Sequence, residues 1–369
     1  FTSNRLLQDE SLRVRRALLE AIAATHLEEY YPSLLKGLYY KSTREAAVQA
    51  LIRLENEALP MLVKLAEDSY APEVVRTHAW NTIGQIGTSE ALDILVGHLT
   101  IAWGFTRRSI LRILLKLPQE AGIEAVSNLL GRSGIEALIN QELGLMGQLY
   151  AGLIDLSTDV VYGREADLLR GGLQDQQVDT LERLFLLMRF LYSSSTIQAA
   201  AFNLQSSSQD GVARGIEILD NTLDIAGKRA MLTILDRRSN QEKLQSLSDI
   251  ISYTPMSPSN RLRHLLELRH FLSDWTLACC FHLARDYRWS LTPDQTLACL
   301  RHPVSFVREA AISYLQVASP LVLRAMLPLL QTDPDRLVAA QVKEILATLE
   351  SPSSSSKNGL TYSSGQAGI

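Results

Sequence analysis

Two cysteines and a histidine near position 280 have the residue types and spacing that could support chemistry. In the stretch LACCFHLARDYRW, Cys279 and His282 are three positions apart and therefore share one face of a helix, with Cys280 beside them. Thiolate and imidazole are ligands that zinc prefers, but a structural zinc site needs four of them. His264 and His270 are near in sequence, but there is no second cysteine pair. Because free cysteine is also a common small core residue, we predict that this cluster is part of the core and binds no metal.

A catalytic role for the same residues requires more than spacing. A cysteine nucleophile needs a lowered thiol pKa and a nearby base. His282 could act as a base for Cys279, but the apolar residues around them predict buried, inert thiols. The sequence also lacks glycine-rich phosphate loops, HExxH, GxSxG and the protein-kinase motifs. We therefore predict no catalytic residue and no cofactor.

Four basic residues are the best candidates for a binding surface. Arg108, Arg112 and Lys116 are spaced i, i+4 and i+8, so they form one line along a helix, and Arg107 lies beside it. A solvated helix face is the ordinary explanation of such a line. The alternative is contact with an acidic protein partner or with anionic lipid, because aligned like charges destabilise a helix slightly unless something compensates them. If an external contact exists in the N-terminal half, we expect it at these four residues.

The elements that would position these residues repeat along the chain. The stretch HPVSFVREAAISYLQVASP places Val307 and Arg308 ahead of two alanines, and similar stretches occur six more times. The first four copies are spaced by 29, 32 and 31 residues, and the last two by 31. A fixed period in this range predicts a solenoid. The equivalent anchor residues are Val14, Thr43, Val75, Thr106, Val212, Val307 and Val338.

Each repeat also has a first half with apolar residues at helical spacing, such as EALPMLVKLAEDSYAP before the third copy. The unit is therefore a helix, a short turn and a second helix. One unit cannot bury both of its apolar faces, so neighbouring units must stack. We predict that Ala310 and Ala311 let adjoining helices approach closely. Arg308 should meet acidic residues or carbonyl groups of a neighbouring repeat.

Helix pairs in which Val-Arg-x-Ala-Ala opens the second helix resemble HEAT repeats. The spacing of about 30 residues is shorter than the ~40–47 residues of eukaryotic HEAT units. It is similar to the compact bacterial HEAT-like repeats first associated with phycobilisome lyases. The resemblance covers residues 11–132 and 303–349. We predict an all-α fold, an α-solenoid of about eight or nine helix pairs.

The pattern divides the chain into four parts. Residues 1–132 carry the N-terminal repeats, and residues 133–253 carry divergent helical repeats. Residues 254–350 carry the C-terminal repeats after a loop rich in proline and serine. Residues 351–369 are rich in serine and glycine and lack apolar periodicity, which predicts a flexible tail.

The divergent part supports a second resemblance. The run LERLFLLMRFLY, a short loop and then GVARGIEILDNTLD are similar to the HEAT region that follows the membrane domain in ATP:ADP antiporter-like, major-facilitator-type proteins of cyanobacteria. The most specific piece is the run from Glu217 to Asp224. This resemblance implies a cytoplasmic regulatory region, at the membrane face through a membrane domain N-terminal to Phe1. The transport residues of such proteins lie in that domain, so none is assigned here.

Composition narrows the function further. The formal net charge is −4, from 36 basic and 40 acidic residues, so no nucleic-acid partner is expected. Three cysteines in a chain of 369 residues favour a reducing compartment. No apolar run reaches the ~18 residues that span a bilayer. The absence of an initiator Met predicts a piece of a longer or processed protein.

We therefore expect a non-catalytic scaffold that presents an extended surface to a protein partner. Two alternatives remain open at this stage. One is a subunit of a phycobilin lyase or isomerase, which would need a groove where Arg and Asp or Tyr converge on the propionates. The other is a free-standing soluble adaptor.

Overall fold

The computed structural model describes residue 9 and residues 11–350. This part of the chain is helical throughout and contains no strand, which confirms the predicted all-α solenoid. The predicted flexible tail, residues 351–369, lies outside the described residues. No described helix combines the length and the apolar character that crossing a bilayer requires.

Twenty α-helices and three short 3₁₀ turns follow one another along the described residues. The N-terminal arm comprises α2 (Leu12–Thr25), α3 (Tyr31–Gly37), α4 (Arg44–Arg53), α5 (Leu59–Glu67), α6 (Glu73–Ile86), α7 (Ser89–Ile101), α8 (Gly104–Lys116) and α9 (Ala121–Leu129). The middle comprises α10 (Gly131–Asp155), α11 (Arg164–Met188), α12 (Ser194–Leu204), α13 (Gln209–Thr222), α14 (Lys228–Leu235) and α15 (Asn240–Ser246). The C-terminal arm comprises α16 (Pro258–Glu267), α17 (Asp274–Asp286), α18 (Pro293–Cys299), α19 (Ser305–Ala318), α20 (Pro320–Leu330) and α21 (Arg336–Glu350). The 3₁₀ turns are Glu28–Tyr30, Glu55–Ala58 and Pro118–Glu120.

Within the described part, nine pairs of consecutive helices can be assigned as first and second helices of a repeat, and the two helices of each pair are in contact. The pairs run from α3/α4 to α9/α10, from α12/α13 to α14/α15 and from α16/α17 to α20/α21. Helix α2 has no first helix among the described residues, and α11 packs against α10. Helices α2, α4, α6 and α8 begin next to the four N-terminal anchor residues and are the second helices of the four predicted N-terminal copies. Residues that would precede α2 as its first helix lie outside the described part.

The anchor residues share a backbone position. In six of the seven copies, the N–H one residue after the anchor donates to the carbonyl three residues before it. Val212 is one residue out of this register, because its own N–H donates to the Ser208 carbonyl. The six equivalent bonds are Arg15 to Ser11, Arg44 to Tyr40, Arg76 to Pro72, Arg107 to Trp103, Arg308 to Val304 and Ala339 to Asp335.

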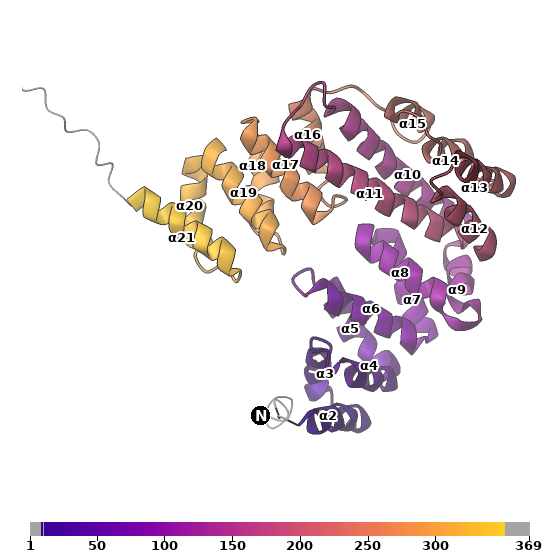
Figure 1. The fold of residues 1–369 in the computed structure, drawn as a ribbon. Helices are drawn as coiled ribbons and strands as arrows, with labels where there is room; N and C mark the ends of the chain where they lie inside the picture. The colour runs from indigo at the N-terminus through magenta and orange to yellow at the C-terminus, as the bar shows by residue number, and fades with distance from the viewer. Residues whose placement is uncertain (1–8, 10, 351–369) are drawn as a thin grey trace, which may run out of the picture.

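Two long helices join the arms into one arc (Figure 1). Helices α10 and α11 have 25 residues each. Helix α11 contacts α8 of the N-terminal arm and α17 of the C-terminal arm. Figure 1 shows α8 and α11 on the inner side of the arc, with α9 and α10 outside them. The apolar core is correspondingly divided into two clusters that meet along α10 and α11.

The second helix α19 shows how a repeat buries its apolar face. Val307, Ala311 and Leu315 follow one another at helical spacing and are all buried. Ala310 and Ala311 are fully buried, and α19 packs against α17, the second helix of the preceding unit. Small side chains at this contact let the two helices lie close together.

Ala311→Phe should therefore destabilise the C-terminal arm by about 1–3 kcal/mol through overpacking. Ala318→Phe is the matched control, because Ala318 is exposed at the end of the same helix and should change stability by less than about 0.5 kcal/mol. Urea unfolding of the two variants measures the difference. An Ala311→Phe variant as stable as the parent would show that Ala311 is not at a helix contact.

Candidate functional site

Most of the basic residues predicted to line α8 form ion pairs with acidic residues of the same chain. Arg107 has 0% of its surface exposed. Its guanidinium donates to Glu142 and Gln141 of α10, both at 2.8 Å, and lies 4.4 Å from the centre of the Trp103 ring. A fully buried side chain does not reach an external partner, so the prediction that Arg107 binds one is wrong.

Glu142 lies between two arginines. Its second carboxylate oxygen accepts from Arg183 Nε of α11 at 2.9 Å, and Arg183 also donates to the Thr180 hydroxyl at 3.0 Å. All three members of the Arg107–Glu142–Arg183 triad are buried. Burial lowers the pKa of Arg107, and the Glu142 carboxylate opposes that shift. The triad ties α8 to α10 and α11, where the two core clusters meet.

The other three cations lie further along α8. Arg108 donates to Asp179 of α11 at 2.9 Å and to Glu182 at 3.4 Å, and Arg112 also pairs with Glu182. Lys116 is exposed at the end of the helix. The acidic partners are 70 to 74 residues away in sequence. The only feature of the sequence that could have indicated them is the three-residue spacing of Asp179 and Glu182, which places both on one helix face.

The cysteines lie in the C-terminal core. Cys279, Cys280 and Cys299 are free thiols with 2% or less of their surface exposed. Burial raises the pKa of Cys279 and Cys299 to about 11 and also raises that of Cys280. His282 faces Glu309 at 3.8 Å. Among the described residues, no group of three or more potential metal ligands is present.

All three thiols should therefore resist alkylation by iodoacetamide in the native chain at neutral pH, since the protonated thiol is a poor nucleophile. They should react once the chain is unfolded in urea. Mass spectrometry counts the labelled residues in each state. Native labelling of Cys279 as fast as in urea, or stoichiometric zinc that is lost on Cys279→Ser, would contradict the assignment to an inert core.

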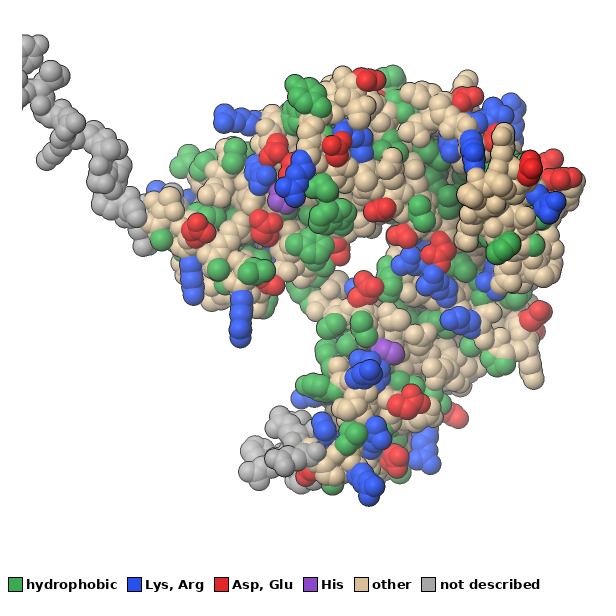
Figure 2. All heavy atoms as spheres, viewed as in Figure 1, with side chains coloured by type: hydrophobic (Ala, Val, Ile, Leu, Met, Phe, Trp, Pro, Cys, Tyr) green, Lys and Arg blue, Asp and Glu red, His purple; other side chains and the backbone are tan. Residues whose placement is uncertain are grey.

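The two arms approach each other through the turns that join the helices of a pair. Tyr70, in the α5–α6 turn, donates its hydroxyl proton to the Arg301 carbonyl at 2.8 Å, across 231 residues of sequence. Trp103, before α8, contacts Phe271, before α17, with ring centres 4.3 Å apart and edge-to-face geometry. The space between the arms is a groove, closed at its base by α11. Figure 2 shows the opening between the arms, with charged and apolar side chains at its rim.

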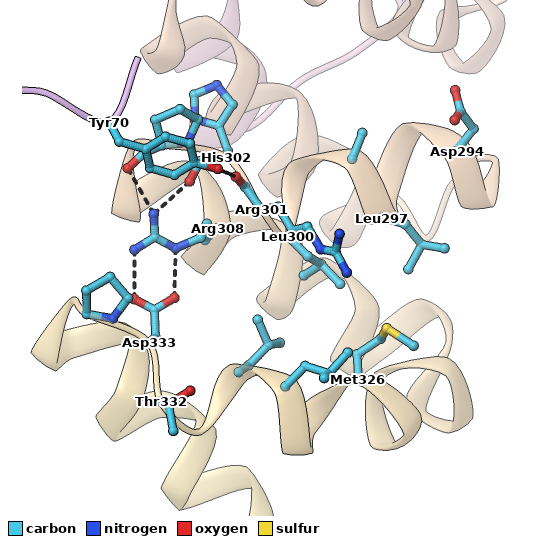
Figure 3. Close-up of a pocket in the computed structure, with 15 residues that line it drawn as sticks. Tyr70, Asp294, Leu297, Leu300, Arg301, His302, Arg308, Met326, Thr332 and Asp333 are labelled. Atoms are coloured by element: carbon cyan, nitrogen blue, oxygen red, sulfur yellow. Dashed lines mark hydrogen bonds and ion pairs between the residues drawn. The ribbon is translucent and has the colours of Figure 1, made fainter. Parts of the chain in front are cut away.

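An outer pocket of about 780 Å³ lies where Tyr70 meets the C-terminal arm (Figure 3). Its walls include Leu297 from α18, Leu300 directly after that helix and Met326 from α20. The Tyr70 ring lies over the turn that begins with Arg301. Tyr70 itself is 69% exposed, so one hydrogen bond and little buried area hold this end of the groove closed.

Arg308 forms part of the outer pocket and is fully engaged. It pairs with both carboxylate oxygens of Asp333 in the next repeat, at 2.7 and 2.8 Å, and donates to the carbonyls of His302 and Pro303. This confirms the prediction that Arg308 meets an acidic residue of a neighbouring repeat, whereas the two carbonyl groups belong to the turn of its own repeat. The sequence did not indicate the pocket beside it, because Tyr70 comes from the other arm.

An inner pocket of about 400 Å³ lies deeper in the groove. Its lining comes from α6, α8, α11 and the α16–α17 turn. Arg76, Arg108 and Arg183 line it together with the acidic residues Glu73, Asp179 and Asp274, and Trp103 and Phe271 form an aromatic wall. The inner pocket is therefore polar and charged, whereas the outer pocket is mainly apolar.

The sequence of residues 32–116 matches the family model for HEAT repeats. These residues comprise α3 to α8, the regular part of the N-terminal arm. No curated protein matches the chain. The match supports a HEAT-like repeat protein, a helical repeat scaffold of the kind that commonly mediates protein interactions.

Proposed function

We propose that the chain is a non-catalytic HEAT-like scaffold that holds a protein partner in the groove between its two arms. The observation that supports this most strongly is a set of exposed apolar residues beside the turns that join the helices of a pair. The second residue of several second helices is apolar and exposed, although it borders a turn where polar residues are usual. These residues are Val74 in α6, Trp275 in α17, Phe306 in α19 and Leu337 in α21.

Cross-linking the arms tests this proposal. A short bis-maleimide would join the cysteines of a Tyr70→Cys, Arg301→Cys variant, since these residues touch across the groove. The native thiols are buried and should not interfere. We expect the unlinked variant to capture a partner from native lysate and the linked variant to lose it. Single-cysteine variants capped with a mono-maleimide are the controls. Equal capture by the linked and unlinked forms would contradict binding between the arms.

We further propose that this scaffold is the cytoplasmic regulatory region of a nucleotide-transporter-like membrane protein. The support is the resemblance of the run from Glu217 to Asp224, which spans the end of α13 and the following loop. The gene upstream of Phe1 tests it. Ten or more apolar segments of about 20 residues would support the proposal. A start codon within a few residues would favour the free-standing adaptor instead.

The lyase alternative has weaker support. It needs arginine and Asp or Tyr side chains free to bind propionates in one groove. In the outer pocket, Arg308 and Asp333 already pair with each other, and the Tyr70 hydroxyl is bound to the Arg301 carbonyl. These groups of the outer pocket are therefore not free to bind propionates.

A further inference from the structure

We propose that the inner pocket binds a carboxylate side chain of the partner segment that the groove holds, with Arg76 as its main cation. This inference rests on the proposed function and adds the chemistry of the partner. The bound segment would place a glutamate or aspartate beside Trp103 and Phe271, with its apolar residues toward the outer pocket.

Arg76 carries the argument because it lines the pocket and its side chain lacks the partner that three of the four equivalent arginines have. The residue after the anchor is also arginine in α2, α4, α8 and α19. Arg15 of α2 likewise has a buried Nε without an acceptor, but it does not line the pocket. Arg44 donates to the Leu38 carbonyl at 3.0 Å, Arg107 pairs with Glu142, and Arg308 pairs with Asp333. In the part of the chain that the structure describes, the Arg76 side chain has no hydrogen bond or ion pair, and its Nε is buried. Because the Arg76 guanidinium lines the pocket without an acidic partner, an incoming carboxylate would form a charge-assisted hydrogen bond with it.

Other groups at the pocket support an anion at the same place. Arg183, which is almost fully buried, and Arg108 line the pocket beside Arg76. Helix α8 begins at the pocket wall, and its N-cap residue Trp103 provides no side-chain acceptor. The positive end of its dipole therefore faces the pocket.

The acidic residues of the pocket set the specificity. Asp179 is paired with Arg108, and Asp274 lies 3.6 Å from His302, whereas Glu73 has no ion pair among the described residues. Glu73 and Asp274 are exposed, so solvent screens them more than it screens the partly buried Arg76. They weaken the binding of an anion without preventing it. Neutralising Glu73 should therefore strengthen binding, and neutralising Arg76 should weaken it.

A pair of peptides tests this inference. Both are pentapeptides with a fluorinated N-terminal cap and an amidated C-terminus, one with a central glutamate and one with a central glutamine. Broadening of the fluorine resonance on titration with the full chain gives each affinity. We expect the glutamate peptide to bind about tenfold more tightly than the glutamine peptide, as one charge-assisted bond allows.

In Arg76→Gln this preference should disappear, and in Glu73→Gln it should increase. Arg112→Gln is the matched control, since Arg112 lies on α8 but not among the residues that line the pocket, and it should bind like the parent. Circular dichroism establishes that each variant is folded. Equal binding of the two peptides by the parent, or an unchanged preference in Arg76→Gln, would overturn the inference. If the peptide test fails but cross-linking the arms still prevents capture of the partner, the proposed function stands and only this inference is overturned.

Discussion

Glu142→Gln should lower the free energy of unfolding by about 3–5 kcal/mol, because it leaves two buried arginines without their counterion. Glu142 has no exposed surface, and each of its carboxylate oxygens accepts from a different arginine, at 2.8 and 2.9 Å. Glutamine keeps the shape but removes the charge, and it can accept only one such bond. Urea unfolding followed by circular dichroism measures the loss.

Glu182→Gln is the matched control. Glu182 also pairs with two arginines, Arg108 and Arg112, but its side chain is 34% exposed. Surface pairs of this kind contribute about 0–1 kcal/mol. Replacing the buried triad together, with Arg107→Met, Glu142→Leu and Arg183→Met, should restore much of the stability that Glu142→Gln loses. A Glu142→Gln variant no less stable than Glu182→Gln would contradict the buried triad.

Asp333→Ala should have the second largest effect, about 3–5 kcal/mol, confined to the last repeats. Asp333 and Arg308 form a bidentate pair with 4% and 7% of their side chains exposed. Removing the carboxylate leaves Arg308 buried with only two backbone carbonyls as acceptors. Because α19–α21 pack mainly against neighbouring repeats, the loss should appear as faster hydrogen exchange in α19–α21 and not in α2–α8.

Asp335→Ala provides the control for this prediction. Asp335 lies two residues further on and accepts from the N–H groups of Leu337 and Val338 at the start of α21. These bonds lower the pKa of Asp335, so its stabilisation is present above the unfolded pKa and is lost as pH falls through the folded one. Its removal should loosen only the first turn of α21. If Asp333→Ala and Asp335→Ala changed hydrogen exchange in α19–α21 to the same extent, Asp333 would have no special role.

The fold could be predicted from sequence because its signals are local. Helix periodicity and the Val-Arg-x-Ala-Ala pattern each lie within one repeat. The predicted contact of Arg308 reaches only the adjacent repeat. The approach of the arms was not predictable in this way. Small rotations between successive repeats add up over the whole array, and only their sum brings Tyr70 to Arg301.

The candidate site was predicted less well for the same reason. Arg107, Arg108 and Arg112 were assigned to a possible external surface because nothing within one helix indicated their acidic partners. Those partners lie on α10 and α11, which the divergent sequence predicts only as helices. Arg76 was not singled out, since its distinguishing feature is a missing partner. Sequence spacing shows which side chains share a face, but not which of them remain unpaired after the repeats stack.

A photocrosslinking experiment tests most directly whether the groove holds the partner. A benzophenone amino acid would replace Phe306, on the first turn of α19 beside the turn that Tyr70 contacts, or Phe202, which is 79% exposed on α12 outside the groove. Illumination of the chain with its captured partner should give a covalent adduct from position 306 and none from position 202. An adduct from position 202 without one from position 306 would show that the partner binds elsewhere on the scaffold.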